Sequence, residues 1–284
     1  MEPNKCYPNI SQSLLLLLLY IGLQLVIAVP VAILSLIFRF PEMHPVVLAV
    51  MNVSVMGILI AWGLRKTGAP FREVFPLKRV SWSLFLPIAL TVMGMSIVVS
   101  EIGNLLQTVF SMPEWLKKFM EKALSEQNSV WGIVLVAVII APLTEEFLFR
   151  GLILRGYLKQ YSVTRSIIVS AILFGVFHFN IFQFIGATML GILFAWWTVQ
   201  TRSLIPALFG HALNNALPII YGRVLKLDIP GYTSGNLDQV EFHPAWFNAM
   251  GVVLAAVGVL ILHQMFRTRA AVSVNALGWS GQTD

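Results

Sequence analysis

The chain of 284 residues carries a net charge of +6, yet only 11% of its residues are charged and 57% are hydrophobic. A soluble globular domain has about 25% charged residues, so this composition excludes an ordinary soluble protein and favours a membrane protein. The basic residues lie in short segments between apolar runs, which is typical of membrane topology and argues against nucleic acid as a partner. Cys6 is the single cysteine, so neither an intramolecular disulfide nor a cysteine metal site is expected.

Eight apolar stretches predict the elements of the fold in chain order. A helix that crosses the hydrocarbon layer needs about 20 apolar residues, and all but the fifth stretch approach that length. The stretches are continuous rather than alternating, which favours helices over a β-barrel. The predicted fold class is all-α: one integral membrane domain, residues 1–284, forming a polytopic bundle of about eight transmembrane helices. The predicted spans are Ser13–Phe38, Val46–Leu64, Leu84–Phe110, Val130–Phe149, Ser166–His178, Phe182–Val199, Leu204–Tyr221 and Trp246–Phe266.

The first stretch and the basic residues predict the topology. Ser13–Phe38 is too long for the core of a signal peptide and lacks a cleavage motif, so we expect it to remain as the first span. With the N-terminus inside, the inner segments hold 13 of the 19 Lys and Arg residues. Both termini are therefore expected in the cytoplasm, with a loose tail over residues 268–284. The short loops favour the inner (plasma) membrane of a prokaryote. The inner basic residues are Lys5, Arg65, Lys66, Arg72, Lys78, Arg79, Arg150, Arg155, Lys159, Arg165, Arg202, Arg267 and Arg269.

Polar residues inside the spans are functional candidates, because an ionisable side chain is costly in lipid. Asp228, Asp238 and Asp284 are the only aspartates, and all lie outside the spans, which excludes an aspartyl intramembrane protease. There is no His-Glu-x-x-His motif for a zinc site-two protease and no Gly-x-Ser-x-Gly elbow for a serine mechanism. Glu101, with Asn104 nearby in the third span, is expected to make an interhelical polar contact.

The fourth span ends in two adjacent carboxylates, Glu145 and Glu146, just after Pro142. Glu146 and Arg150 are four residues apart, so they share a helix face and can pair. Glu145 is rotated away by about 100° and is free to point elsewhere. A carboxylate without a partner in a dry pocket suits a general base.

Polar residues on two further spans can meet this carboxylate. His178 closes the fifth span, and His211 and Asn215 lie four apart on one face of the seventh. Two donors on one inward face suit the stabilisation of an oxyanion. If the fourth helix continues to Leu158, Glu145 lies about 13 residues, or roughly 20 Å, from its inner end, a depth that His178 can match.

Three motifs occur in order on separate spans, within a core of about residues 130–221. They are Glu-Glu-x-x-x-Arg (Glu145, Glu146, Arg150), Phe-x-x-x-His (Phe174, His178) and His-x-x-x-Asn (His211, Asn215). In that order the motifs resemble those of the CAAX-processing and bacteriocin-processing (CPBP) intramembrane protease family, also called the Abi family, which includes the type II CAAX prenyl endopeptidases.

The resemblance implies an intramembrane endopeptidase that cleaves a peptide bond near the cytoplasmic side of the membrane. It implies that Glu145 and His178 activate the attacking water and that His211 and Asn215 hold the oxyanion. The residues that would support this site are Glu146 and Arg150. The expected partners are membrane lipid and a peptide or protein substrate, either prenylated or inserted in the membrane.

The cofactor and the class of function each leave an alternative open. Glu145, His178 and His211 supply one oxygen and two nitrogen ligands, a set that suits zinc, yet the same residues allow catalysis without a metal. A non-catalytic membrane scaffold or bacteriocin self-immunity protein of the same fold is the main alternative function. A scaffold has no need to bury unpaired ionisable groups, which favours the enzyme. A transporter with a proton relay is the third reading, and the lack of an internal repeat argues against it.

Overall fold

The computed structural model describes residues 6–39, 44–114, 116–118, 130–233 and 239–276, and the secondary structure of these residues is entirely helical. Six helical segments among them are long and apolar enough to cross a membrane, which confirms an all-α, polytopic membrane bundle. These segments are Ile10–Phe38, Pro45–Thr67, Trp82–Val109, Val130–Leu158, Ile181–Thr201 and Ala245–Thr268.

The predicted fifth and seventh spans are helices, but they are shorter than the other six. α9 (Val163–Val176) has 14 residues, and α11 (Ile205–Ile219) has 15 before it continues as the π-helical turn η4 (Ile220–Val224). At 1.5 Å per residue, α9 and α11 cover only about 21–23 Å, less than a hydrocarbon layer of about 30 Å. Within the described residues, six helices rather than eight are therefore long enough to span by themselves.

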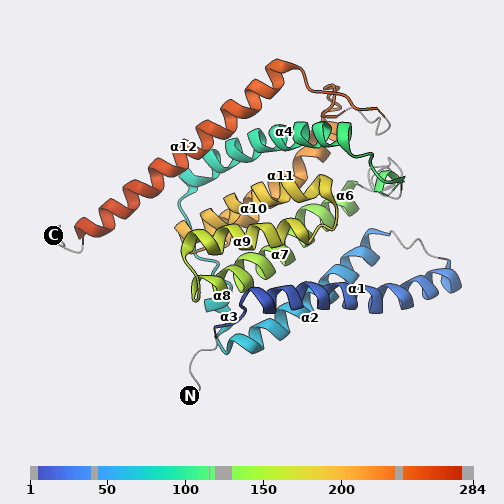
Figure 1. Ribbon diagram of the computed structural model, residues 1–284, viewed down its shortest axis with the longest axis horizontal. Helices are drawn as coiled ribbons and strands as arrows, with labels where there is room; N and C mark the ends of the chain where they lie inside the picture. Colours follow the sequence, from blue (N-terminus) through green and yellow to red (C-terminus); the bar gives the residue numbers. More distant parts are fainter. Residues whose placement is uncertain (1–5, 40–43, 115, 119–129, 234–238, 277–284) are drawn as a thin grey trace.

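The helices form a central layer between two helix pairs (Figure 1). On one side α1 (Ile10–Phe38) packs beside α2 (Pro45–Thr67), and on the other α4 (Phe85–Val109) packs beside α12 (Ala245–Ala276). The fourth span, α9, α10 (Ile181–Thr201) and α11 lie between these pairs. The motif-bearing helices therefore occupy the middle of the molecule.

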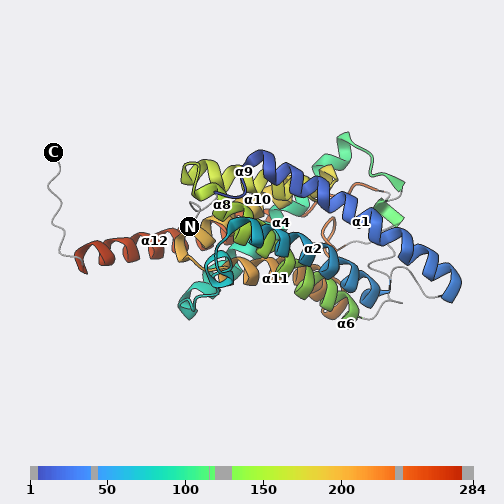
Figure 2. The same cartoon turned by 90° about the horizontal axis from the view of Figure 1, so that it is seen from below.

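The start of α1 and the end of α12 lie at the same side of the bundle (Figure 1), as expected for an even number of spans. The short helices α3 (Phe71–Val74) and η1 (Trp82–Leu84) connect α2 to α4. Helix α12 extends beyond the other helices (Figure 2) and reaches Ala276, so its backbone runs into the predicted tail, residues 268–284. That this side faces the cytoplasm stays a prediction from the basic residues.

The fourth span is one continuous helix that runs to Leu158 instead of ending at Phe149. Two of its segments have the π register, in which an N–H bonds to the carbonyl five residues earlier, and such segments often mark functional sites. The added length places Glu145 at the depth that meets His178. The segments are α6 (Val130–Ile133), η2 (Val134–Ile140), α7 (Ala141–Glu146), η3 (Phe147–Ile153) and α8 (Leu154–Leu158).

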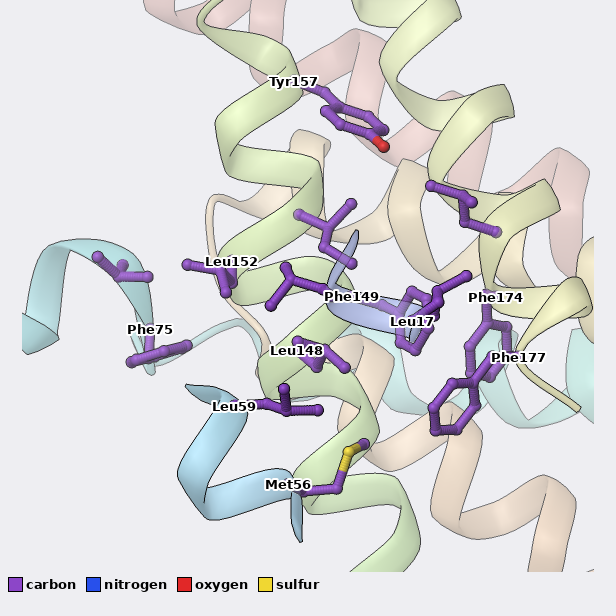
Figure 3. Packing of buried hydrophobic residues seen from close by; sticks show 14 of the residues in the cluster. Leu17, Met56, Leu59, Phe75, Leu148, Phe149, Leu152, Tyr157, Phe174 and Phe177 are labelled. Atoms are coloured by element: carbon purple, nitrogen blue, oxygen red, sulfur yellow. The ribbon is translucent and has the colours of Figure 1, made fainter. Parts of the chain in front are cut away.

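The main apolar core surrounds this fourth span (Figure 3). Phe149 is fully buried, and its ring centroid lies 5.1 Å from that of Phe174 and 5.2 Å from that of Phe177. The α1–α2 pair also contributes to this cluster. Its contributions are Leu16, Leu17, Val55, Met56 and Leu59. The helix that carries the two carboxylates is therefore fixed by packing from α1, α2 and α9.

The pair α4–α12 is held by close backbone approach and by a buried polar cluster. A Cβ at Gly94 would meet backbone atoms of Ala255 and Gly251, so the two helices touch there without intervening side chains. Towards the end of α4 and the start of α12, Glu101 accepts hydrogen bonds from Asn104 Nδ2 (3.0 Å) and Asn248 Nδ2 (2.9 Å). The expected interhelical contact of Glu101 is thereby confirmed.

The Gly94 contact leads to a first prediction. Gly94→Ala should lower the thermal unfolding temperature in detergent, with a cost of about 1–3 kcal/mol, because the added methyl group overlaps fixed backbone rather than a flexible side chain. Gly103→Ala, on the same helix with open space around the added atom, should leave stability equal or higher because Ala favours helix. Equal behaviour of the two variants would contradict the close helix contact.

Candidate active site

Glu146 is the centre of the polar site, because two cationic or potentially cationic side chains share one of its oxygens. Arg150 Nη1 donates to Glu146 Oε1 at 3.1 Å, and both side chains are essentially inaccessible to solvent. His211 Nδ1 lies 2.8 Å from the same oxygen. Since an ionised carboxylate only accepts, Nδ1 carries the proton, and the opposite ring nitrogen, Nε2, is turned away from Glu146.

Aromatic rings and a backbone carbonyl complete the enclosure of this pair. The Arg150 guanidinium lies 4.3 Å from the ring centroid of Phe174 and 5.3 Å from that of Phe194. Its Nη2 also donates to the Gly191 carbonyl at 3.2 Å. Phe194 stacks on His211, with centroids 5.4 Å apart and planes inclined by 24°. Arg150, which the sequence places among the inner basic residues, is thus a buried part of the site.

Glu145 lies next to this network but is not bonded into it. Its Oε2 atom is buried and has no hydrogen-bond partner among the described residues. It lies 3.8 Å from His211 Nε2, beyond hydrogen-bond length. The carboxylate is therefore free on the side that Nε2 faces, as expected from its rotation away from Glu146. An unpartnered carboxyl oxygen at this depth is available for chemistry.

His178 sits in the turn that follows α9 and approaches the site from a third element. Its Nδ1 lies 2.9 Å from the Phe174 carbonyl oxygen, which only accepts, so Nδ1 carries the proton and Nε2 is the free nitrogen. His178 is close enough to Glu145 to interact with it electrostatically. The next residue, Phe179, has a φ of 53°, a conformation that bulky residues rarely adopt.

Asn215 is expected to hold an oxyanion, and in the structure its amide also bonds to a backbone carbonyl of the fourth span. Its Nδ2 donates to the Ala137 carbonyl at 2.8 Å. In the π register the Ala141 N–H bonds to Val136, so the next donor in line for Ala137 would be residue 142. Pro142 has no N–H, and Asn215 supplies the missing donor. One of the two N–H bonds of the Asn215 amide is used in this way, and the other remains available.

The net charge of the cluster explains how it can exist inside a membrane. With Glu145 and Glu146 ionised and Arg150 and His211 protonated, the charges sum to zero. If the proton on His211 Nε2 moves to Glu145, the sum is still zero. Either state avoids the large cost of a net charge in a medium of low dielectric.

A zinc ion bound in this cluster would need three of its residues as ligands. Glu145, His178 and His211 have the right ligand atoms, but among the described residues no three His, Cys, Asp or Glu side chains come close enough together to hold a metal ion. As arranged, the three do not fit a zinc site.

The sequence pattern gave no signal for Phe194 and Gly191, because apolar residues in an apolar helix all look alike. Pro142 inside a helix leaves a carbonyl without its backbone donor, so the sequence signals such a carbonyl one turn earlier, but only the π register assigns it to Ala137 rather than Val138.

Residues 127–217 match the family model described as type II CAAX prenyl endopeptidase Rce1-like, and this range contains all the motif residues. The chain is also similar to "Putative membrane peptidase YdiL" of Bacillus subtilis (strain 168), with 24% identity over 88 residues, which are 31% of this chain and 36% of that protein. The match thus spans about a third of the length of that relative. No solved structure matches. These matches confirm the resemblance to the CAAX-processing family and, with the apolar helices, an integral membrane protein.

The buried Glu146–Arg150 pair and the exposed Glu73–Arg155 pair allow a matched test. Arg150→Met should destabilise the protein by about 3–5 kcal/mol, because it leaves Glu146 buried without its guanidinium. Arg155→Met, whose partner is half exposed, should cost less than about 1 kcal/mol. Thermal unfolding in detergent measures both. The double variant Arg150→Met/Glu146→Leu should recover part of the loss, and equal stability of both single variants would contradict the buried network.

A second stability test concerns Asn215. Asn215→Ala should cost about 1–3 kcal/mol because the Ala137 carbonyl loses its donor. Adding Pro142→Ala should restore much of this loss, since residue 142 then has an N–H for that carbonyl. Asn214→Ala serves as control and should have little effect, because Asn214 donates to Asn215 Oδ1 and not to a backbone carbonyl of the fourth span, as far as the described residues go. No rescue by Pro142→Ala would show that Asn215 acts through other contacts.

Proposed function

We propose, from the family resemblance of residues 127–217 and the geometry of the site, that this chain is an intramembrane endopeptidase acting near the cytoplasmic side of a prokaryotic inner membrane. One observation carries the proposal: within the described part of the chain Glu145 Oε2 has no hydrogen-bond partner, and it faces His211 Nε2 across 3.8 Å. A general base and an electrophilic donor are thereby side by side, as hydrolysis of a peptide bond requires.

The first step is activation of water by Glu145. The carboxylate takes one proton from a water molecule as the water oxygen attacks the scissile carbonyl carbon. His178 Nε2, which is left without a proton, accepts a hydrogen bond from the same water and orients it. Two acceptors aimed at one water fix its lone pair toward the substrate, which lowers the entropic part of the barrier.

The second step is stabilisation of the tetrahedral oxyanion by His211. In the charge state with both carboxylates ionised, the His211 ring is an imidazolium whose Nε2–H can donate to the oxyanion. The remaining N–H of Asn215 is a second donor. Glu146 holds the imidazolium by its Nδ1–H and keeps it from rotating, and Arg150 keeps Glu146 in place.

The third step is collapse of the intermediate. The carbon–nitrogen bond breaks, and protonated Glu145 gives its proton to the departing amine, which returns the site to its starting state. When the oxyanion is present, Glu145 is neutral, so the cluster with its intermediate again sums to zero. Each stage is thus electrically neutral, which is the condition for such chemistry in a membrane.

The expected substrate is a peptide or protein, prenylated or embedded in the membrane, and lipid is the surrounding partner. The proposed chemistry uses side chains alone. A chelator therefore belongs in the first experiment, because it tests zinc dependence directly.

Purified protein in liposomes should cleave a peptide from a panel that includes a fluorescent farnesylated CAAX peptide. Glu145→Gln should reduce kcat by about 10²–10⁴-fold or more, since it removes the general base without changing the shape of the side chain. Glu73→Gln, on the surface, is the matched control and should leave kcat unchanged. Activity should persist in 1,10-phenanthroline.

Two results would contradict this expectation, each in a different way. Loss of activity in chelator, restored by added zinc, would assign a metal to the mechanism. If the wild type and Glu145→Gln proteins are equally inactive on the whole panel and equally functional in cells, the scaffold or immunity role replaces the enzyme.

A further inference from the structure

Helix α1 carries a hydrogen-bonded polar pair in the middle of an otherwise apolar, lipid-facing sequence. Gln24 Nε2 donates to the Tyr20 hydroxyl at 2.8 Å, and both side chains are partly buried. Polar side chains within a membrane helix are functional candidates unless packing accounts for them. Both residues lie outside the segment that matches the family model, residues 127–217.

The pair lies at the same depth as Glu145. Gln160 Nε2 donates to the Pro8 carbonyl at 3.1 Å, and Pro8 packs against Gly156, so α1 begins level with the end of the fourth span. The two helices then run in opposite directions. Tyr20 lies ten residues beyond the start of α1, or roughly 15 Å, and Glu145 lies eleven residues before Gly156, or roughly 17 Å.

Tyr20 is also in contact with the turn that carries His178. Its ring centroid lies 4.4 Å from that of Phe177 and 6.5 Å from that of Phe179, with the latter ring nearly parallel. These two residues flank His178 in the chain. The carboxylate of Glu145 is close enough to act electrostatically on the Tyr20 phenol. Tyr20 therefore packs on the turn that carries His178.

The hydrogen-bonding capacity of the pair is only half used. The Tyr20 oxygen accepts a hydrogen bond from Gln24 Nε2. Among the described residues, no acceptor binds the Tyr20 hydroxyl proton, and no donor binds Gln24 Oε1. One donor and one acceptor are thus available, one turn apart. A peptide unit in an extended chain offers the complementary pair, a carbonyl and an N–H, and in lipid both must find partners.

We propose that Tyr20 and Gln24 bind the main chain of an extended peptide substrate and position its scissile bond against Glu145. This inference rests on the proposed function and deepens it. It makes the substrate an unwound segment rather than an intact helix, because the backbone groups of a helix are already bonded to one another. Tyr20 is a positioning residue, and the chemistry stays with Glu145, His178 and His211.

The test is Tyr20→Phe, which removes the hydroxyl and keeps the ring against Phe177 and Phe179. With the farnesylated CAAX peptide, KM should rise about three- to tenfold, the effect of one lost hydrogen bond, while kcat changes less than twofold. The variant Gln24→Leu should act similarly, and the double variant should be less than additive. Thermal stability should stay at the wild-type level.

Tyr232→Phe is the matched control, because that hydroxyl bonds to Ser96 at the far end of the bundle and should leave KM unchanged. An unchanged KM in Tyr20→Phe, with the wild type active, would overturn the inference and leave the proposed function standing.

A binding measurement distinguishes the inference about Tyr20 and Gln24 from the proposed function. The Kd of the same fluorescent peptide is measured on Glu145→Gln protein with and without Tyr20→Phe. If the wild type does not cleave but Tyr20→Phe weakens binding three- to tenfold, the pair binds an extended peptide, and the proposed function fails together with the positioning of a scissile bond. An equal Kd, or no binding by Glu145→Gln protein, overturns the inference.

Discussion

A carboxylate buried in a membrane bundle is stabilised by positive charge beside it, and Glu146 has Arg150 and His211 in that position. One of its two oxygens, Oε1, receives both Arg150 and His211, so α7, η3 and α11 are fixed relative to one another by one acceptor atom. The aromatic rings around Arg150 exclude water from the contact and strengthen it. Glu145 is left outside this contact because Glu146 already binds both Arg150 and His211.

The second constraint is that backbone groups in lipid need partners. Pro142 and the π register together leave the Ala137 carbonyl without a main-chain donor, and the Asn215 amide fills that role. The irregular helix and the polar residue on α11 therefore depend on each other. In an α-helical register Pro142 would leave the Val138 carbonyl without its donor, so the π register is what places the unpaired carbonyl at Ala137, where Asn215 reaches it.

The sequence predicted most of the fold because burial in lipid is a strong constraint on composition. Eight helices, the Glu146–Arg150 pair and the polar contact of Glu101 all follow from apolar length and from i, i+4 spacing. The fifth stretch is short in the sequence as well, but the short length of α11 did not follow, since an apolar run does not show whether it faces lipid or other helices. The contact of His211 with Glu146 was equally hidden, because register between helices depends on packing of rings such as Phe194, which no local pattern encodes. The catalytic roles of Glu145, His178, His211 and Asn215 remain proposals that activity must decide.

The three parts of the bundle differ in how they are joined. The α4–α12 pair is joined backbone to backbone at Gly94, whereas α1 meets the centre through side chains such as Leu17 and Tyr20 and leaves much of its length facing outward. A helix attached in this way can exchange side chains during evolution without disturbing the charged cluster. Chemistry and substrate preference would then diverge at different rates in different segments of one gene. Relatives that share the core motifs need not share substrates, and the sequences of their first helices are the ones to compare.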